Sequence, residues 1–189
     1  MQLKGKNVLF LGSSVTYGSA SGGISFADIM AEQCGFNCIK EAVSGTNLAD
    51  IGENSYVSRL KRLSNLPKID LFVCQLSTND ASRKIPIEKI EEAILFIADY
   101  AKNNFKCPIV FYTNTYYDDE GYFKMVELLK RLVKELEIFI INLYDDCEMR
   151  SVSQADYKLY MKDRIHPTLI GYKEWWTPKF IGFLEGILP

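Results

Sequence analysis

Hydrophobic residues follow two alternating patterns along this chain. Short apolar runs, typical of buried strands in a parallel sheet, occupy residues 8–11, 36–43, 69–76, 108–112 and 137–143. Longer segments carry apolar residues three or four positions apart, which is typical of helices, at residues 24–33, 56–63, 86–103, 122–136 and 168–184. The pattern therefore predicts strands separated by helices.

Glycine and proline mark the ends of several predicted helices. Gly35 lies just past the first helix, and Pro86 suits the first turn of the third. Pro178 falls inside the last helix, which it should interrupt or shift. Two connections, residues 114–120 and 144–164, are longer than simple turns, and long loops in a compact domain are often functional.

Strands that alternate with helices pair in parallel through right-handed crossovers. We therefore predict an α/β fold: a three-layer α/β/α sandwich, flavodoxin-like, with a five-stranded parallel sheet in the order 2-1-3-4-5. The length of 189 residues fits one domain over residues 1–189, without repeats, low-complexity tracts or linkers.

Composition and charge narrow the classes of partner. Hydrophobic residues make up 48% of the chain and charged residues 24%, which argues against disorder. The formal net charge of −2 gives no basic field, so we expect neither a nucleic-acid nor a membrane partner. There is no signal-peptide pattern and no apolar run of membrane length, so we expect a cytoplasmic protein. Nothing in the sequence indicates an oligomeric state.

The cysteines do not indicate a disulfide framework. Their number, five, is odd, and Cys38, Cys74 and Cys107 lie in or beside apolar runs. We expect buried, reduced thiols. No cysteine pair or second histidine completes a zinc site around Cys34 and Cys38, so we predict no metal.

Polar residues with possible chemistry follow the strands. In open parallel sheets, ligands bind outside the carboxyl ends of the strands. Gly12-Ser13-Ser14-Val15-Thr16 follows the first strand, Ser44-Gly45 the second and Ser77-Thr78-Asn79-Asp80 the third. Beyond the fifth strand and a long loop comes Asp163-Arg164-Ile165-His166-Pro167. A serine, a glycine, an asparagine and the only histidine should therefore gather at one edge of the sheet.

Each of these segments also has a structural explanation. Residues 12–16 could cap a helix or hold a phosphate, as in a flavodoxin-like nucleotide-binding module. Gly45 could be only a turn residue, and residues 79–80 a turn or a helix cap. A lone histidine is structural about as often as it is functional, and Asp163 could be a loop carboxylate.

The four segments together resemble the sequence blocks of the SGNH (GDSL-like) hydrolases, in the order that this family has them. Gly12 to Thr16 resembles the nucleophile block, and residues 42–45 (Ala-Val-Ser-Gly) resemble the glycine block. Residues 77–80 resemble the Gly-x-Asn-Asp block, and residues 163–166 the Asp-x-x-His block. The resemblance spans residues 8 to about 176.

The resemblance implies a serine ester hydrolase that works through an acyl-enzyme and without a cofactor. It implies that Ser14 is the nucleophile, His166 the general base and Asp163 the group that orients the imidazole. The backbone N–H groups of Ser14 and Gly45 and the side chain of Asn79 would form the oxyanion hole. The expected substrate is a small-molecule acyl ester, including O-acetyl groups on carbohydrates. The alternatives are a thioester or a lysophospholipid at the same site, or the phosphate-binding module.

Two positions depart from the family pattern. Ser13 stands where the family usually has aspartate, and Ser77 stands where it usually has glycine. Neither position supplies the attacking group or a named oxyanion donor, so we expect altered local loop geometry with activity retained. Thr16 replaces the second glycine of Gly-x-Ser-x-Gly, which argues against an α/β-hydrolase elbow at Ser14.

Other polar and aromatic residues give weaker indications. Tyr116 and Tyr117 follow the fourth strand and could bind substrate, by stacking on a sugar or lining an acyl pocket, or could be ordinary loop aromatics. Residues 118–120 (Asp-Asp-Glu) could bind a cation, but acidic residues before a helix usually favour its N-terminal dipole. Trp175 and Trp176 are expected in the core or an interface.

Overall fold

The computed structural model describes residues 3–187, which form a five-stranded parallel sheet with helices on both faces. The strand order is β2-β1-β3-β4-β5, with every neighbouring pair parallel. This confirms the predicted order. The strands are β1 (Asn7–Gly12), β2 (Asn37–Ala42), β3 (Leu71–Gln75), β4 (Ile109–Tyr112) and β5 (Phe139–Ile141).

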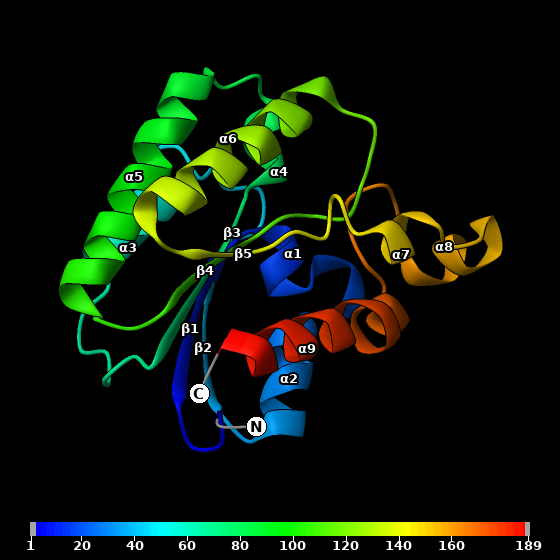
Figure 1. Ribbon diagram of the computed structural model, residues 1–189, viewed down its shortest axis with the longest axis horizontal. Helices are drawn as coiled ribbons and strands as arrows, with labels where there is room; N and C mark the ends of the chain where they lie inside the picture. Colours follow the sequence, from blue (N-terminus) through cyan, green and yellow to red (C-terminus); the bar gives the residue numbers. More distant parts are fainter. Residues whose placement is uncertain (1–2, 188–189) are drawn as a thin grey trace.

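Helices cover the sheet in two outer layers (Figure 1). One face carries α3 (Tyr56–Arg62), α5 (Ile87–Asn104) and α6 (Glu120–Leu136), and the other carries α2 (Phe26–Cys34) and α9 (Thr177–Ile187). The shorter helices are α1 (Ser14–Tyr17), η1 (Ser19–Ser21), α4 (Thr78–Ser82), α7 (Cys147–Arg150), α8 (Gln154–Tyr160) and η2 (Gly171–Trp176). The predicted three-layer sandwich is therefore correct.

The strands alternate their side chains between two hydrophobic cores, one on each face of the sheet. In β1, Leu9 and Leu11 enter the core beneath α3, α5 and α6, while Val8 and Phe10 enter the core beneath α2 and α9. All four side chains are 0% exposed. Burial on both faces explains why these strands appear in the sequence as continuous apolar runs.

The ends of the elements follow local capping chemistry. The first long helix begins two residues later than the apolar pattern suggested, because Ser25 forms a capping box with Asp28. It ends, as predicted, at Gly35 in a left-handed conformation. The last strand is shorter than predicted because Glu137 adopts a φ of +53° and closes α6. A residue with that φ cannot continue into an extended strand.

The predicted final helix begins as a π-helix. The wide turns of η2 run over Gly171–Trp176, and the Thr177 N–H donates to the Tyr172 carbonyl five residues earlier. Pro178 follows directly, and its missing N–H leaves the preceding turn without one α-helical donor. This accounts for the interruption of the last helix that was predicted at Pro178. Gly171 allows close contact with α8, because a Cβ there would lie 2.8 Å from the Tyr160 carbonyl carbon.

The long segment after β5 is folded, although its sequence suggested only a loop. It contains α7 and α8, whose N-caps are the side chains of Asp146 and Ser153. Both helices are too short for a clear hydrophobic period. Trp175 and Trp176 are buried in the core, as expected.

All five cysteines are free thiols, and their burial varies. Cys74 is fully buried, Cys38 and Cys107 are half-buried, and Cys147 is exposed. Burial raises the pKa of Cys38 to about 12 and that of Cys107 to about 11. These two thiols are therefore protonated, and so unreactive, at neutral pH.

Within residues 3–187, no helix is long and apolar enough to cross a membrane.

Phe180 should be essential to the core beneath α9. It is 0% exposed, and its ring stacks on Phe26 with centroids 4.1 Å apart. Phe180→Ala should lower the free energy of unfolding by about 3–5 kcal/mol, because it leaves a cavity between α2 and α9. The matched control is Phe123→Ala in α6, where the side chain is 47% exposed and the expected change is within about 0.5 kcal/mol. Urea unfolding measures both, and equal losses would contradict this account of the core.

Candidate active site

Ser14 lies at the carboxyl end of the inner strand β1, as the first residue of the short helix α1. Its backbone N–H has no acceptor within the helix, since the first turn of any helix leaves its N–H groups free. The residue is 7% exposed. The Tyr172 hydroxyl donates to the Val15 carbonyl at 2.7 Å and so fastens α1 to the last helical layer.

The turn that leads to Ser14 is held by one buried side chain, Gln75 at the end of β3. Its Oε1 accepts from the Ser13 N–H at 2.9 Å and from the Thr16 hydroxyl at 2.8 Å. All three residues are 0% exposed. Glycine is required at position 12, because a Cβ there would lie 2.9 Å from Gln75 Oε1 and would overlap the Thr16 side chain. The turn that carries Ser14 is therefore tied to the neighbouring strand β3.

His166 lies directly against Ser14, although 152 residues separate them in the chain. Its Nε2 is 2.9 Å from Ser14 Oγ, and its Nδ1 is 2.9 Å from Asp163 Oδ2. An ionised carboxylate can only accept, so the neutral ring carries its proton on Nδ1. This leaves Nε2 free to accept a proton from the serine hydroxyl.

The three-residue spacing of Asp163 and His166 has a local cause. Asp163 Oδ1 accepts from the backbone N–H of Ile165 at 2.7 Å and of His166 at 2.8 Å. The Lys162 N–H donates to the His166 carbonyl at 2.8 Å, which closes the turn. The side chain of Asn114, just after β4, donates to the Ile165 carbonyl at 3.2 Å and docks this turn on the sheet edge.

The carboxylate of Asp163 is electrostatically stabilised. Partial burial alone would raise its pKa, but the hydrogen bonds from the His166 ring and from the N–H groups of Ile165 and His166 outweigh that effect. The net result is a pKa of Asp163 below its ordinary value. Asp163 therefore stays ionised beside the imidazole at every pH above that of an ordinary aspartate's titration.

Gly45, in the loop after β2, and Asn79, in the first turn of α4, border the Ser14 turn. Gly45 has a φ of +76°, and among the described residues its N–H has no acceptor. A Cβ at this position would meet nothing within 4 Å. Glycine is therefore favoured here by backbone conformation, and not by crowding within the protein. The Asn79 Nδ2 donates to the Thr46 carbonyl at 2.9 Å, which uses one of its two N–H groups.

Two further residues after β3 hold the Gly45 loop in place. The buried carboxylate of Asp80 accepts from the Leu48 N–H at 2.8 Å and the Ala49 N–H at 2.9 Å. Burial raises the pKa of Asp80, although these backbone hydrogen bonds act in the opposite direction. Arg83 donates to the Gly45 carbonyl at 2.8 Å and also contacts the Asn47 side chain. The loop is thus anchored on both sides of Thr46.

The sequence matches the GDSL-like lipase/acylhydrolase family over residues 10–174. The chain belongs to this family. No protein with a curated function matches the sequence.

Three solved structures illustrate how far the fold of this GDSL-like chain is shared. A Lactobacillus plantarum protein superposes with a TM-score of 0.83 at 16% identity, over 98% of this chain and 99% of its own. An acetylxylan esterase from Geobacillus stearothermophilus gives 0.73 at 16% identity, over 96% and 95%. A lipolytic G-D-S-L family protein from Veillonella parvula gives 0.73 at 15% identity, over 95% and 98%. Family membership makes the chain a serine carboxylic ester hydrolase.

The two departures from the GDSL-like pattern both have structural roles. The Ser13 hydroxyl is buried and lies 3.3 Å from Gln75 Oε1, to which it donates. The Ser77 hydroxyl accepts from the Asn79 N–H at 3.2 Å and caps α4. It is therefore Ser77, and not Asn79, that caps this helix. The Asn79 side chain is left to face the Gly45 loop.

The two tyrosines after β4 differ in their surroundings. Tyr116 is 39% exposed and lines a cavity of about 220 Å³ with Arg150 and Trp175. Tyr117 is 4% exposed, and its ring stacks on Tyr122 with centroids 4.9 Å apart. Tyr117 therefore belongs to the core, and only Tyr116 remains a candidate for substrate contact in this GDSL-like enzyme.

Within residues 3–187, no three His, Cys, Asp or Glu side chains are grouped to hold a metal ion.

Sequence reasoning missed several residues that support the site. Gln75 is the one polar residue in an otherwise apolar strand, which was a visible signal. Arg59 and Arg83 carried no such signal, because arginine on a helix is ordinarily a surface residue.

Proposed function

We propose that this enzyme hydrolyses acyl esters through a covalent acyl-enzyme on Ser14. The proposal rests chiefly on the continuous hydrogen-bonded chain from Ser14 Oγ through His166 to Asp163, with 2.9 Å at both links to the ring. In the first step the imidazole takes the serine proton while Oγ attacks the acyl carbon. The imidazole then protonates the leaving alkoxide. In the second step the imidazole takes a proton from a water molecule, whose oxygen attacks the acyl carbon. The bond between that carbon and Ser14 Oγ then breaks, the imidazole returns the proton to Oγ, and the acid is released.

Negative charge develops on the carbonyl oxygen of the tetrahedral intermediate. We propose that the N–H groups of Ser14 and Gly45 and the second N–H of Asn79 Nδ2 stabilise it. In support, the Ser14 N–H is at a helix start, the Gly45 N–H has no acceptor among the described residues, and Asn79 has one donor in use. These donors are already oriented before the reaction, which is what makes such sites effective.

The substrate we propose is a small O-acyl ester, with acetyl groups on carbohydrates as the first class to test. The acetylxylan esterase of similar fold supports this choice. Thioesters and lysophospholipids are the alternatives on the same machinery. Hydrolysis of acetylated xylan in preference to acyl-CoA or lysophosphatidylcholine supports the first class, and the reverse preference contradicts it.

Ser14 should be the residue labelled by a fluorophosphonate. The reagent phosphonylates an activated serine hydroxyl, and mass spectrometry of peptides locates the adduct. Ser14→Ala should abolish labelling and lower kcat for p-nitrophenyl acetate by several orders of magnitude while the fold is retained. Ser13→Ala is the matched control, since its hydroxyl faces Gln75 and should not be labelled. An adduct on Ser13, or none in an active preparation, would rule out this assignment.

The Asp163 variant should be less impaired than the His166 variant. His166→Ala removes the group that transfers protons, whereas Asp163→Ala leaves the imidazole present and able to accept one. Hydrogen bonds hold the pKa of Asp163 below its ordinary value, so its carboxylate should keep orienting the ring at pH values where an ordinary aspartate would already be protonated. The activity ratio of the wild type to Asp163→Ala should therefore stay constant from neutral pH into that range. A pH series of kcat/KM on the wild type and the two variants measures this. Equal losses in the two variants at neutral pH, or a ratio that already falls in the ordinary aspartate range, would contradict it.

Asn79→Ala should act on kcat far more than on KM. Losing one oxyanion donor typically costs about a hundred- to thousand-fold in kcat, and the ground-state carbonyl gains less from the donor. The lost bond to Thr46 should also lower stability, by about 1 kcal/mol. Ser77→Ala is the matched control, because it removes the actual helix cap and should affect stability more than kcat. An Asn79→Ala enzyme with near-normal kcat would show that Asn79 is only a loop anchor.

A further inference from the structure

Arg59 is a charged residue on the buried side of α3. It is 4% exposed, and its guanidinium lies over the ring of Tyr56 at 5.1 Å. Its ion-pair partner Glu41, at the end of β2, lies 3.0 Å from Nη1 and is 29% exposed. A buried cation needs a partner for each of its donors, because no water replaces them.

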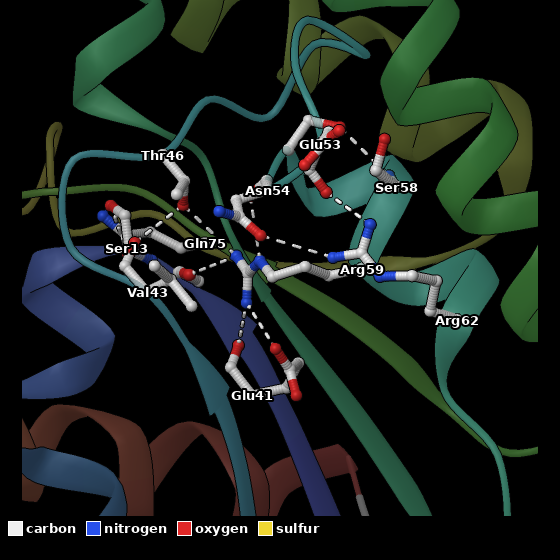
Figure 2. Close-up of polar contacts among 12 residues, drawn as sticks. Ser13, Glu41, Val43, Thr46, Glu53, Asn54, Ser58, Arg59, Arg62 and Gln75 are labelled. Atoms are coloured by element: carbon white, nitrogen blue, oxygen red, sulfur yellow. Dashed lines mark hydrogen bonds and ion pairs between the residues drawn. The ribbon is translucent and has the colours of Figure 1, made fainter.

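The side-chain hydrogen bonds of Arg59 go to the carboxyl ends of β1 and β2 and to the loop after β2 (Figure 2). Nε donates to the Asn54 carbonyl at 3.1 Å, and Nη1 donates to both the carbonyl and the carboxylate of Glu41. Nη2 donates to the Gly12 carbonyl at 2.7 Å and to the Thr46 hydroxyl at 3.3 Å. These five contacts match the five N–H donors of a guanidinium.

The two contacts of Nη2 link the two turns that carry the proposed oxyanion donors, the turn of Ser14 and the turn of Gly45. Gly12 precedes the Ser13–Ser14 turn, and its carbonyl also accepts from the Val43 N–H at 3.3 Å. The Thr46 hydroxyl donates to the Val43 carbonyl at 2.7 Å and so closes the turn that contains Gly45. One nitrogen of Arg59 therefore holds the nucleophile turn and the Gly45 turn at a set distance from each other.

Stability alone is a weak reason for burying this charge. Replacing a buried ion pair by apolar residues is often neutral or stabilising, because desolvation offsets the attraction. Arginine does have a rigid planar fork that fixes several acceptors in one geometry, which lysine cannot do. The planar guanidinium of Arg59 acts in this way, because it bonds at once to the end of β1, the end of β2 and the loop after β2.

We propose that Arg59 is a positioning residue that sets the separation between the N–H groups of Ser14 and Gly45 in the oxyanion hole. This rests on the proposed function, in which both groups stabilise the intermediate. Arg59 contacts no substrate atom. It acts through the Gly12 carbonyl and the Thr46 hydroxyl.

Arg59→Lys tests the proposal on the full-length enzyme. Lysine keeps the charge but cannot reach Gly12, Thr46 and Glu41 together. A shift of the Gly45 turn by about 1 Å should lower kcat for p-nitrophenyl acetate by roughly 10- to 100-fold, with KM within about twofold. The assay is run well below the melting temperature of the variant, so that the loss of kcat does not come from unfolded protein.

Arg62→Lys is the matched control in the same helix. Arg62 contacts the Glu53 carbonyl and the Asn54 side chain, but neither Gly12 nor Thr46 (Figure 2). It should retain wild-type kcat. A folded Arg59→Lys enzyme with wild-type kcat, or one in which KM changes as much as kcat, would overturn the proposal, as would equal kcat losses in the two lysine variants.

Thr46→Val covers the case in which Arg59→Lys does not fold. Valine keeps the shape of threonine but removes the acceptor for Nη2 and the donor to Val43. It should lower kcat several-fold at unchanged KM, and a wild-type kcat would overturn the proposal.

Fluorophosphonate labelling of the wild type separates failure of the proposed function from failure of the proposed role of Arg59. Without an adduct on Ser14, the proposed function fails. With that adduct and a normal kcat in Arg59→Lys, only the role of Arg59 fails.

Discussion

The structure depends on the hydrogen bonds that pair the backbone groups of the buried turn at the end of β1. Ser13, Thr16 and Gln75 are 0% exposed, and an unpaired polar group in such a place costs about 1–3 kcal/mol. Gln75 receives the N–H and hydroxyl groups of the turn, while Arg59 donates to the Gly12 carbonyl that precedes it. The turn that carries Ser14 is therefore surrounded by side chains from two other elements, and its conformation is set by them.

The same constraint extends to the loop after β2. That loop has little regular structure, and Gly45 within it is exposed. Asn79, Asp80, Arg83 and Arg59 all form hydrogen bonds to it, from α4, its C-terminal cap and α3. Because α4 follows β3 and β3 pairs with β1, the strand order brings these anchors beside Ser14. The order 2-1-3-4-5 therefore matters for the site, because it places the Gly45 loop, which follows β2, and α4, which follows β3, on opposite sides of β1.

Local signals in the sequence were enough to predict the fold, and they also singled out Ser14, Asp163 and His166, which the structure brings within hydrogen-bonding distance. The Asp163 and His166 pair was recognisable because its spacing is a property of one short turn, and Gly35 marked its helix end because a left-handed residue was needed. Residues whose role depends on distant partners were not recognisable. Arg59 sits one helical turn from buried Tyr56, where a charge could equally have pointed outward. Tyr117 was expected at the cleft because it follows β4, but the path of that loop turns its ring onto Tyr122.

Burial divides the site into two unlike halves. The side chain of Asp163 is 53% exposed and that of His166 is 28% exposed, and both are held by a turn that closes on itself. The turns carrying Ser14 and Gly45, by contrast, are fastened by groups out of water, where hydrogen bonds are stronger and small displacements cost more. A proton can be transferred over a range of donor–acceptor geometries, but the stabilisation of an oxyanion depends on donors that do not have to reorganise. In the proposed mechanism, the more rigid framework therefore lies on the side where charge would develop, and the more solvated one lies on the side where the imidazole would exchange protons with water.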